Sequence, residues 1–213
     1  MIRILKTVCR LIIGFIFCSS GTVLAVNSNL GLSPWDVFHQ GLSKITGISM
    51  GQVSIFVGLI VVIATIFLKL EIGLGTIANM ILIGVFMDVI SHTKIIPTSH
   101  NFFVSLLMLL GSLFTMAIGS YLYIGCEMGC GPRDGLMVAL VKKTGKPVGF
   151  IRSCIELGVL VIGFILGGSV GIGTLITVFC LGACIQLVFK VLRFDVGKIK
   201  HCLLYTSPSP RDA

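Results

Sequence analysis

The chain has 213 residues, of which 55% are hydrophobic and 11% are charged, and its mean hydropathy is +1.08. A soluble domain carries about 25% charged residues, so this composition argues against a soluble protein and indicates a membrane protein. The net charge of +8 does not indicate a nucleic-acid partner, because the basic residues lie beside apolar runs rather than in one patch.

Six apolar runs are long enough for membrane-spanning helices, which need about 20 mostly apolar residues. They cover about residues 8–26, 50–69, 73–91, 102–124, 149–167 and 172–190. Residues 1–25 also resemble a signal peptide, since basic residues precede an apolar stretch and the tripeptide VLA. The internal repeat described below favours a retained first span, because the same segment recurs in the interior of the chain.

Lysine and arginine are distributed unequally between the two sets of loops. One side carries thirteen: Arg3, Lys6, Arg10, Lys69, Arg133, Lys142, Lys143, Lys146, Arg152, Lys190, Arg193, Lys198 and Lys200. The other side carries only Lys44 and Lys94. Because basic residues collect on the cytoplasmic side of membrane proteins, we expect both termini in the cytoplasm.

The second half of the chain repeats the first at an offset of 98 residues without a gap. GLSPWDVF at 31–38 corresponds to GCGPRDGL at 129–136, and GLGT at 73–76 corresponds to GIGT at 171–174. Matches at Gly, Pro, Asp and Thr carry this inference, because apolar matches are common in so hydrophobic a chain.

The two repeat units cover about 4–92 and about 102–190, and each contains three spans. An odd number of spans turns the second unit upside down in the bilayer. The sequence therefore predicts an all-α polytopic protein with one membrane domain over 1–201, built from two inverted three-helix repeats.

A short extra helix is predicted after the first span of each repeat. Ser33 or Gly131 precedes it, Pro34 or Pro132 occupies its first turn, and Asp36 or Asp134 is its third residue. The helix runs to about Ser43 or Lys142, where Thr-Gly ends it, and about 12 residues are too short to span a bilayer. Two interpretations stay open: a capped surface helix, or a re-entrant half-helix whose amino end lines a cavity.

The paired motifs GLGT and GIGT predict a tight turn followed by a helix start. Their residues of interest are Gly73, Gly75, Thr76, Gly171, Gly173 and Thr174. Glycine permits the turn and threonine can cap the next span, which favours a plain helical hairpin. The alternative is an anion held by the free amides.

Few ionisable residues lie near or within the spans, and such residues are costly in a bilayer and hence candidates for function. The candidates for a substrate path are Asp36, Asp134, Arg133, Arg152, Glu156 and Asp88. Arg152 and Glu156 are four apart on one helix face and also fit a structural ion pair. Asp88, near one end of its span, also fits ordinary placement at the membrane interface.

No pattern in the chain predicts catalysis, a metal or a cofactor. HExxH is missing, the four histidines are scattered, and the eight cysteines include no CxxC. Cys126 and Cys130, and Cys180 and Cys184, are four apart, but small apolar packing residues explain them better than a metal site. We therefore expect a protein that is not an enzyme.

The last residues differ in kind from the rest. CLLYTSPSPRD at 202–212 resembles one reading frame of a transposase adapter used in sequencing libraries, so we expect 202–213 to be a non-native tail. The alternative is a natural Pro/Ser-rich tail.

Four segments resemble a known family. GLSPWDVFHQGLSKITGISMGQ matches its first-repeat signature, and GCGPRDGLM and LGGSVGIGT, together with the Arg152–Glu156 segment, match the second. Over about residues 5–195 the chain resembles the YczE/YyaS/YitT group of bacterial integral membrane proteins, most closely its YczE-like branch. The resemblance implies a multi-pass protein of the bacterial plasma membrane and carries over neither an activity nor a catalytic residue.

The sequence is consistent with two functions. The inverted duplication and the sparse ionisable groups favour a small-molecule transporter or permease-like protein, in which Asp36, Asp134, Arg152 and Glu156 would converge on one cavity. The alternative is a non-transporting accessory or scaffold protein for another complex or an export pathway. Its partners would be the lipid bilayer and another membrane protein.

Overall fold

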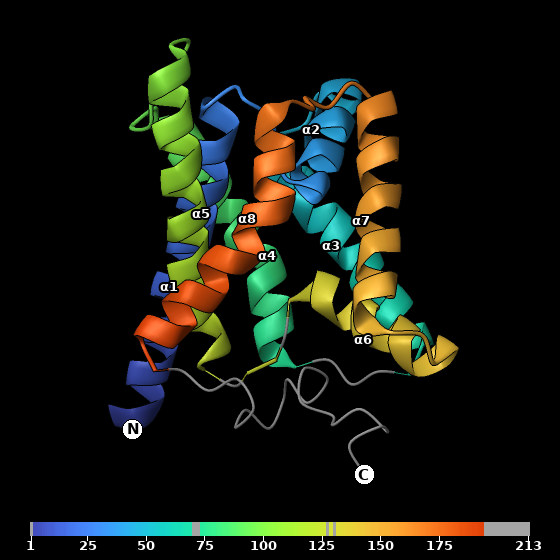
Figure 1. Ribbon diagram of the computed structural model, residues 1–213. Helices are drawn as coiled ribbons and strands as arrows, with labels where there is room; N and C mark the ends of the chain where they lie inside the picture. Colours follow the sequence, from blue (N-terminus) through green and yellow to red (C-terminus); the bar gives the residue numbers. More distant parts are fainter. Residues whose placement is uncertain (1, 70–72, 127, 130, 194–213) are drawn as a thin grey trace.

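The computed structural model describes residues 2–69, 73–126, 128–129 and 131–193, so the expected non-native tail lies outside the described residues. Over these ranges the chain forms helices and no strand (Figure 1). The helices are α1 (Ile2–Asn27), α2 (Pro34–Thr46), α3 (Met50–Phe67), α4 (Leu74–Thr93), α5 (Phe102–Ile124), α6 (Pro132–Thr144), α7 (Val148–Ile165) and α8 (Ile172–Val191).

Five of these helices are long and apolar enough to cross a membrane: α1, α3, α4, α5 and α8. Each coincides with one predicted span, and the remaining predicted span, 149–167, is α7. The 18 residues of α7 include the charged pair Arg152 and Glu156. The chain is therefore a multi-pass helical membrane protein.

The two short helices, α2 and α6, have 13 residues each and similar ends. Each begins with proline, whose missing amide hydrogen is not required in the first turn. Each ends at a glycine in the left-handed conformation, Gly47 at φ 75° and Gly145 at φ 66°. They run to Thr46 and Thr144, a few residues beyond the predicted ends, because the helix continues until these glycines reverse the chain.

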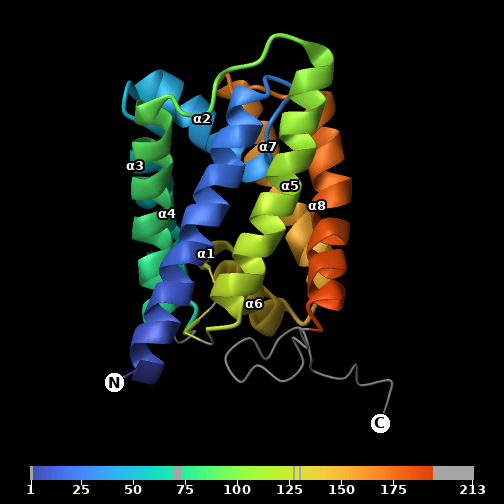
Figure 2. The ribbon, with the colours of Figure 1, turned by 90° about the vertical axis from the view of Figure 1, so that its left-hand side faces the viewer.

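The longest interface joins α1 to α5, which run side by side (Figure 2). Small residues allow the two backbones to approach: a Cβ atom on Gly119 would lie 2.8 Å from the carbonyl oxygen of Gly14. Helix α4 packs against α1, and α8 packs against α5. Helices α2 and α6 fill the other side, where α2 packs on α7 and α3, and α6 packs on α3 and α7.

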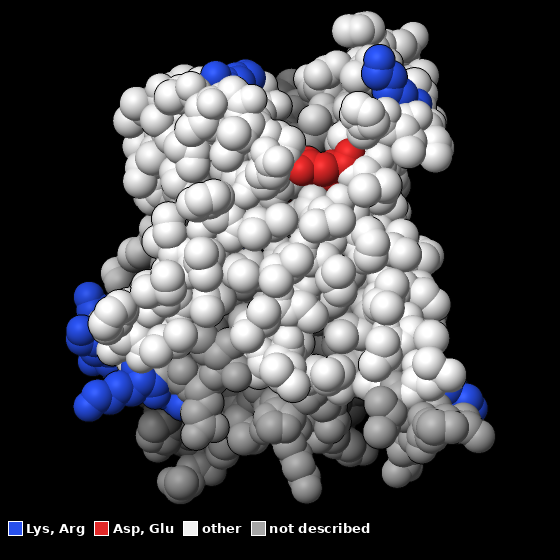
Figure 3. Space-filling view, turned by 180° about the vertical axis from the view of Figure 1, so that it is seen from behind, with Lys and Arg blue, Asp and Glu red and all other residues white. Residues whose placement is uncertain are grey.

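The surface of this bundle is apolar along its length and basic at its ends. On the face in Figure 3, lysine and arginine lie at the upper and lower ends, and the band between them is uncharged apart from a small acidic patch near the upper end. Large apolar side chains such as Phe67, Leu74 and Phe179 are more than three-quarters exposed. An apolar belt between charged ends is what a lipid environment favours.

Candidate functional site

The first turn of α2 is buried inside the molecule. Ser33, Pro34, Trp35 and Asp36 are all shielded, and Asp36 is only 3% exposed. The Ser33 hydroxyl donates to Asp36 Oδ2 at 2.5 Å, and the Asp36 amide donates back to Ser33 Oγ at 3.4 Å. This N-cap arrangement fixes the carboxylate beside the positive end of the helix.

Arg133, in the first turn of α6, reaches the Asp36 carboxylate from the other half of the chain. Its Nη2 lies 3.6 Å from Asp36 Oδ1, and its Cζ lies 5.1 Å from the centre of the Trp35 ring. Trp35 and Arg133 hold the same position in the two copies of the motif, 98 residues apart. The two short helices therefore meet through their equivalent first turns. We call Ser33, Trp35, Asp36, His39 and Arg133 the central cluster.

Two members of the central cluster, Trp35 and His39, were not among the site residues predicted from the sequence. His39 is 2% exposed, and its Nδ1, which has no hydrogen-bond partner among the described residues, lies 3.8 Å from Asp36 Oδ1. Burial, and then the positive charge of Arg133, lowers the pKa of His39 well below its usual range, so the ring is neutral at pH 7. Its i+3 spacing from Asp36 was the available signal, since residues three apart share a helix face.

A second group of charges lies between α6 and α7. Arg152 Nε donates to Glu156 Oε1 at 3.0 Å, and both side chains are partly exposed. On α6, which is not one of the candidate spans, burial raises the pKa of Asp134; Arg152 and Arg133 oppose this shift, and Glu156 adds to it. The charges of three other predicted site residues thus act on Asp134.

Asp88 lies apart from both groups. Its carboxylate accepts hydrogen bonds from the Ser49 hydroxyl and from the Gly51 amide, the latter at 2.8 Å. Ser49 also caps α3, together with Gln52. Asp88 on α4 therefore ties the end of its own helix to the beginning of α3.

The GLGT and GIGT motifs make reciprocal contacts between the two halves of the chain. The Gly75 amide donates to the Met128 carbonyl at 2.8 Å, and the Gly173 amide donates to the Leu30 carbonyl at 2.7 Å. Met128 and Leu30 directly precede Gly129 and Gly31, the first residues of the Gly-Pro-Asp motifs. These two amides are thus bound by carbonyls, and each motif joins the halves instead of merely turning a hairpin.

An open pocket of about 400 Å³ lies where the end of α1 meets the start of α5. It is lined by Ser28, Asn29, Leu30, Ser99, His100, Phe102 and Ser105. None of the six predicted substrate-path residues lines it. Within the described part of the chain, no three His, Cys, Asp or Glu side chains are grouped closely enough to hold a metal ion.

Comparison with known proteins identifies the family. The chain is 34% identical over 194 residues to "Uncharacterized membrane protein YczE" of Bacillus subtilis, covering 90% of this chain and 86% of that protein. It is 33% identical to an "Uncharacterized protein" of Haemophilus influenzae (88% and 85% covered) and 31% identical to "Uncharacterized protein YyaS" of B. subtilis (83% and 89%). No solved structure matches the chain significantly. The model of the "Family of unknown function (DUF6198)" matches residues 5–190, and the chain belongs to this family of YczE- and YyaS-related membrane proteins.

Proposed function

We propose that the chain crosses the membrane six times, as two inverted repeats with α7 as the sixth span. Three pairs of equivalent helices have the same length: 13 residues for α2 and α6, 18 for α3 and α7, and 20 for α4 and α8. Gly31 and Gly129 share an unusual backbone conformation, with φ of 119° and 121°. The reciprocal bonds from Gly75 and Gly173 follow the same offset of 98 residues.

In this proposal both termini lie in the cytoplasm, because basic residues collect on the cytoplasmic side of membrane proteins. A cysteine introduced at Lys94 is expected to react with a membrane-impermeant maleimide in intact cells, above the labelling of the parent chain. A cysteine at Lys142 is expected to react only after the cells are permeabilised. Both positions are exposed, so access to the reagent depends on the compartment. Labelling at Lys142 in intact cells would overturn this orientation.

We further propose that the protein is a transporter of small molecules, and not an enzyme, with the central cluster on the substrate path. The single observation that supports this most is the contact of Arg133 with Asp36 and Trp35 between the two repeats. Transporters with inverted repeats bind substrates at the repeat interface, near the amino ends of interrupted helices. A charged residue in the interior of a membrane protein is costly, which makes a purely structural role expensive.

Arg133 is the cationic group that this contact offers to a ligand. Its side chain is 40% exposed, whereas Asp36 and His39 are buried beneath it. A guanidinium can bind a carboxylate or phosphate group through two hydrogen bonds while it remains on an aromatic ring. We therefore expect the substrate to carry an anionic group that Arg133 binds.

The transport proposal is tested with purified protein in vesicles. Proteoliposomes are incubated with a uniformly ¹³C-labelled bacterial metabolite extract, and the labelled compounds inside are identified by mass spectrometry. At least one anionic or zwitterionic compound is expected to accumulate above protein-free vesicles. Arg133→Ala should abolish this accumulation, because the guanidinium is lost, whereas Lys143→Ala, at an exposed position, should preserve it.

If the Arg133→Ala variant accumulated the compound as well as the parent chain does, the central cluster would not lie on the substrate path. Absence of any accumulation, together with a stoichiometric membrane-protein partner after purification in mild detergent, would favour the accessory or scaffold function instead.

A further inference from the structure

The two helix pairs α3–α4 and α7–α8 are equivalent in the repeat but pack differently. In the first pair a Cβ atom on Gly84 would lie 2.5 Å from Ile55 Cγ1 and 2.7 Å from the Gly51 carbonyl oxygen, so the backbones touch. At the corresponding glycines of the second pair, Gly149 and Gly182, no atom of the described residues outside the glycine's own stretch of helix lies within 4 Å of such a Cβ position. Figure 1 shows α7 and α8 apart, with parts of α3 and α6 visible between them.

Hydrogen bonds also stabilise the contact between α3 and α4. Asp88 accepts from the Ser49 hydroxyl and from the Gly51 amide, and both bonds are charge-assisted. The equivalent positions in the second pair are Gln186 and Pro147, which provide neither the carboxylate nor the hydroxyl. Within the described part of the chain, these hydrogen bonds therefore join α3 to α4 and have no equivalent between α7 and α8.

The two glycine pairs lie toward opposite ends of the bundle, and only the first pair makes a close contact. Gly51 and Gly84 lie toward the end that carries Lys44 and Lys94, because α3 begins there and α4 ends there. Gly149, at the start of α7, and Gly182, in the second half of α8, lie toward the opposite end (Figure 1).

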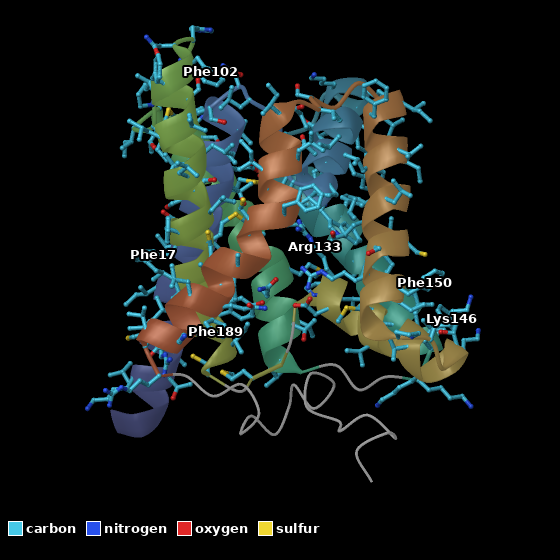
Figure 4. All side chains as sticks on the ribbon, in the orientation of Figure 1. Phe17, Phe102, Arg133, Lys146, Phe150 and Phe189 are labelled. Carbon is cyan, nitrogen blue, oxygen red and sulfur yellow. The ribbon has the colours of Figure 1, made fainter. Side chains whose placement is uncertain are left out.

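The central cluster lies between these two ends. Figure 4 shows Arg133 between α8 and α7, and its side chain is 40% exposed although α6 is surrounded by α3, α4 and α7. Helices α7 and α8 thus make no close contact at Gly149 and Gly182, and the side chain of Arg133, which lies between these helices, remains partly exposed. Helices α3 and α4 close the equivalent position at the other end.

We propose that α3–α4 and α7–α8 are two gates that close alternately over the central cluster. This proposal rests on the inverted repeat and the transport function proposed above. The present structure is the state with the α3–α4 gate closed and the α7–α8 gate open, and the open gate faces the cytoplasm in the proposed orientation.

The closed α3–α4 gate is the template for the closed form of α7–α8. By the offset of 98, Ser153 then meets Gly182 as Ile55 meets Gly84, and Glu156 meets Val178 as Gly58 meets Met80. Closure buries Glu156, and Arg152 at 3.0 Å is its countercharge. In the same step the hydrogen bonds from Ser49 and Gly51 to Asp88 break, because the α3–α4 gate opens.

Disulfide trapping in native membranes tests the two gates. The pair Gly58→Cys with Met80→Cys probes α3–α4, and the pair Ser153→Cys with Gly182→Cys probes α7–α8. Both are placed in a chain whose cysteines on α7 and α8 (Cys154, Cys180 and Cys184), which are exposed or half-exposed, are replaced by alanine. Copper-phenanthroline oxidises the thiols, and mass spectrometry of peptides identifies each disulfide.

The first pair is expected to form a disulfide in most molecules, and the second in a smaller fraction. Asp88→Asn, which keeps the shape but removes the charge, should raise the rate of the 153–182 disulfide about tenfold and lower that of the 58–80 disulfide. The proposal would be overturned if the Asp88→Asn variant formed the 58–80 disulfide but no 153–182 disulfide.

The same experiment separates the gates from the transport function, since it requires no substrate. If both disulfides form but no metabolite accumulates in the vesicles, the two gates are supported and the transport proposal is contradicted. If a metabolite accumulates but the 153–182 disulfide does not form, transport is supported and the α7–α8 gate is contradicted. A second test uses Gly182→Leu in the chain with its native cysteines. This variant should fold as well as the parent chain but prevent α7 and α8 from closing. Gly84→Leu should fail to fold, because the space beside Gly84 is already filled.

Discussion

Gly31→Ala is expected to destabilise the protein by about 3 kcal/mol, the sum of about 1–3 kcal/mol for backbone strain and a similar cost for overpacking. Gly31 has a φ of 119°, which L-amino acids rarely adopt. A Cβ atom there would lie 2.7 Å from both the Gly171 amide nitrogen and Thr174 Oγ1. The substitution would therefore separate the two halves where the GIGT motif crosses to the other repeat.

The measurement is the temperature at which the purified protein in detergent loses its monodisperse gel-filtration peak. The control is Gly158→Ala on α7, where a Cβ atom meets nothing within 4 Å and alanine favours the helix. If Gly31→Ala lost no more stability than Gly158→Ala, the reciprocal contact would not hold the repeats together.

Asp36→Ala is expected to lower stability by about 2 kcal/mol. Removing one partner of a buried ion pair costs about 3–5 kcal/mol, and the partial exposure of Arg133 reduces this value. The change also removes the acceptor of the Ser33 hydroxyl and leaves His39 beside an uncompensated guanidinium.

A double-mutant cycle with Arg133→Met separates the pair from these other losses. The two single changes should together cost about 1 kcal/mol more than the double variant, measured by reversible unfolding in mixed detergent micelles. Asp36→Ala combined with Lys143→Ala supplies the control and should be additive, since Lys143 is exposed and remote. Additivity at Asp36 and Arg133 would mean that the 3.6 Å approach contributes no coupling.

Much of the fold follows from local chemistry. The six apolar runs coincide with six helices, because in lipid a long apolar segment must satisfy its own backbone hydrogen bonds. The starts of α2 and α6 follow from proline in the first turn, and their ends from a glycine after threonine. These features depend on a few neighbouring residues, so they can be inferred without knowing what packs against them.

The candidate site was predictable only in part. Asp36, Arg133 and Asp134 stand out because charge is scarce in so apolar a chain, yet their spacing does not reveal that Arg133 contacts Asp36 and Trp35, which are 97 and 98 residues away. Trp35 gave no signal, and His39 gave only its i+3 spacing from Asp36, because single aromatic residues and histidines are ordinary on a buried helix face. Asp88 was equally visible in the sequence, but its partners, Ser49 and Gly51, come from another helix.

Composition and periodicity were thus enough to establish a helical membrane protein with a duplicated pattern, since both depend on local backbone and lipid chemistry. Packing between distant segments was needed for the rest: the carbonyl partners of Gly75 and Gly173, the contact of the two short helices, and the different packing of α3–α4 and α7–α8. Equivalent sequences at Gly84 and Gly182 pack differently here. A glycine permits a close contact between helices, but the surrounding structure decides whether that contact forms.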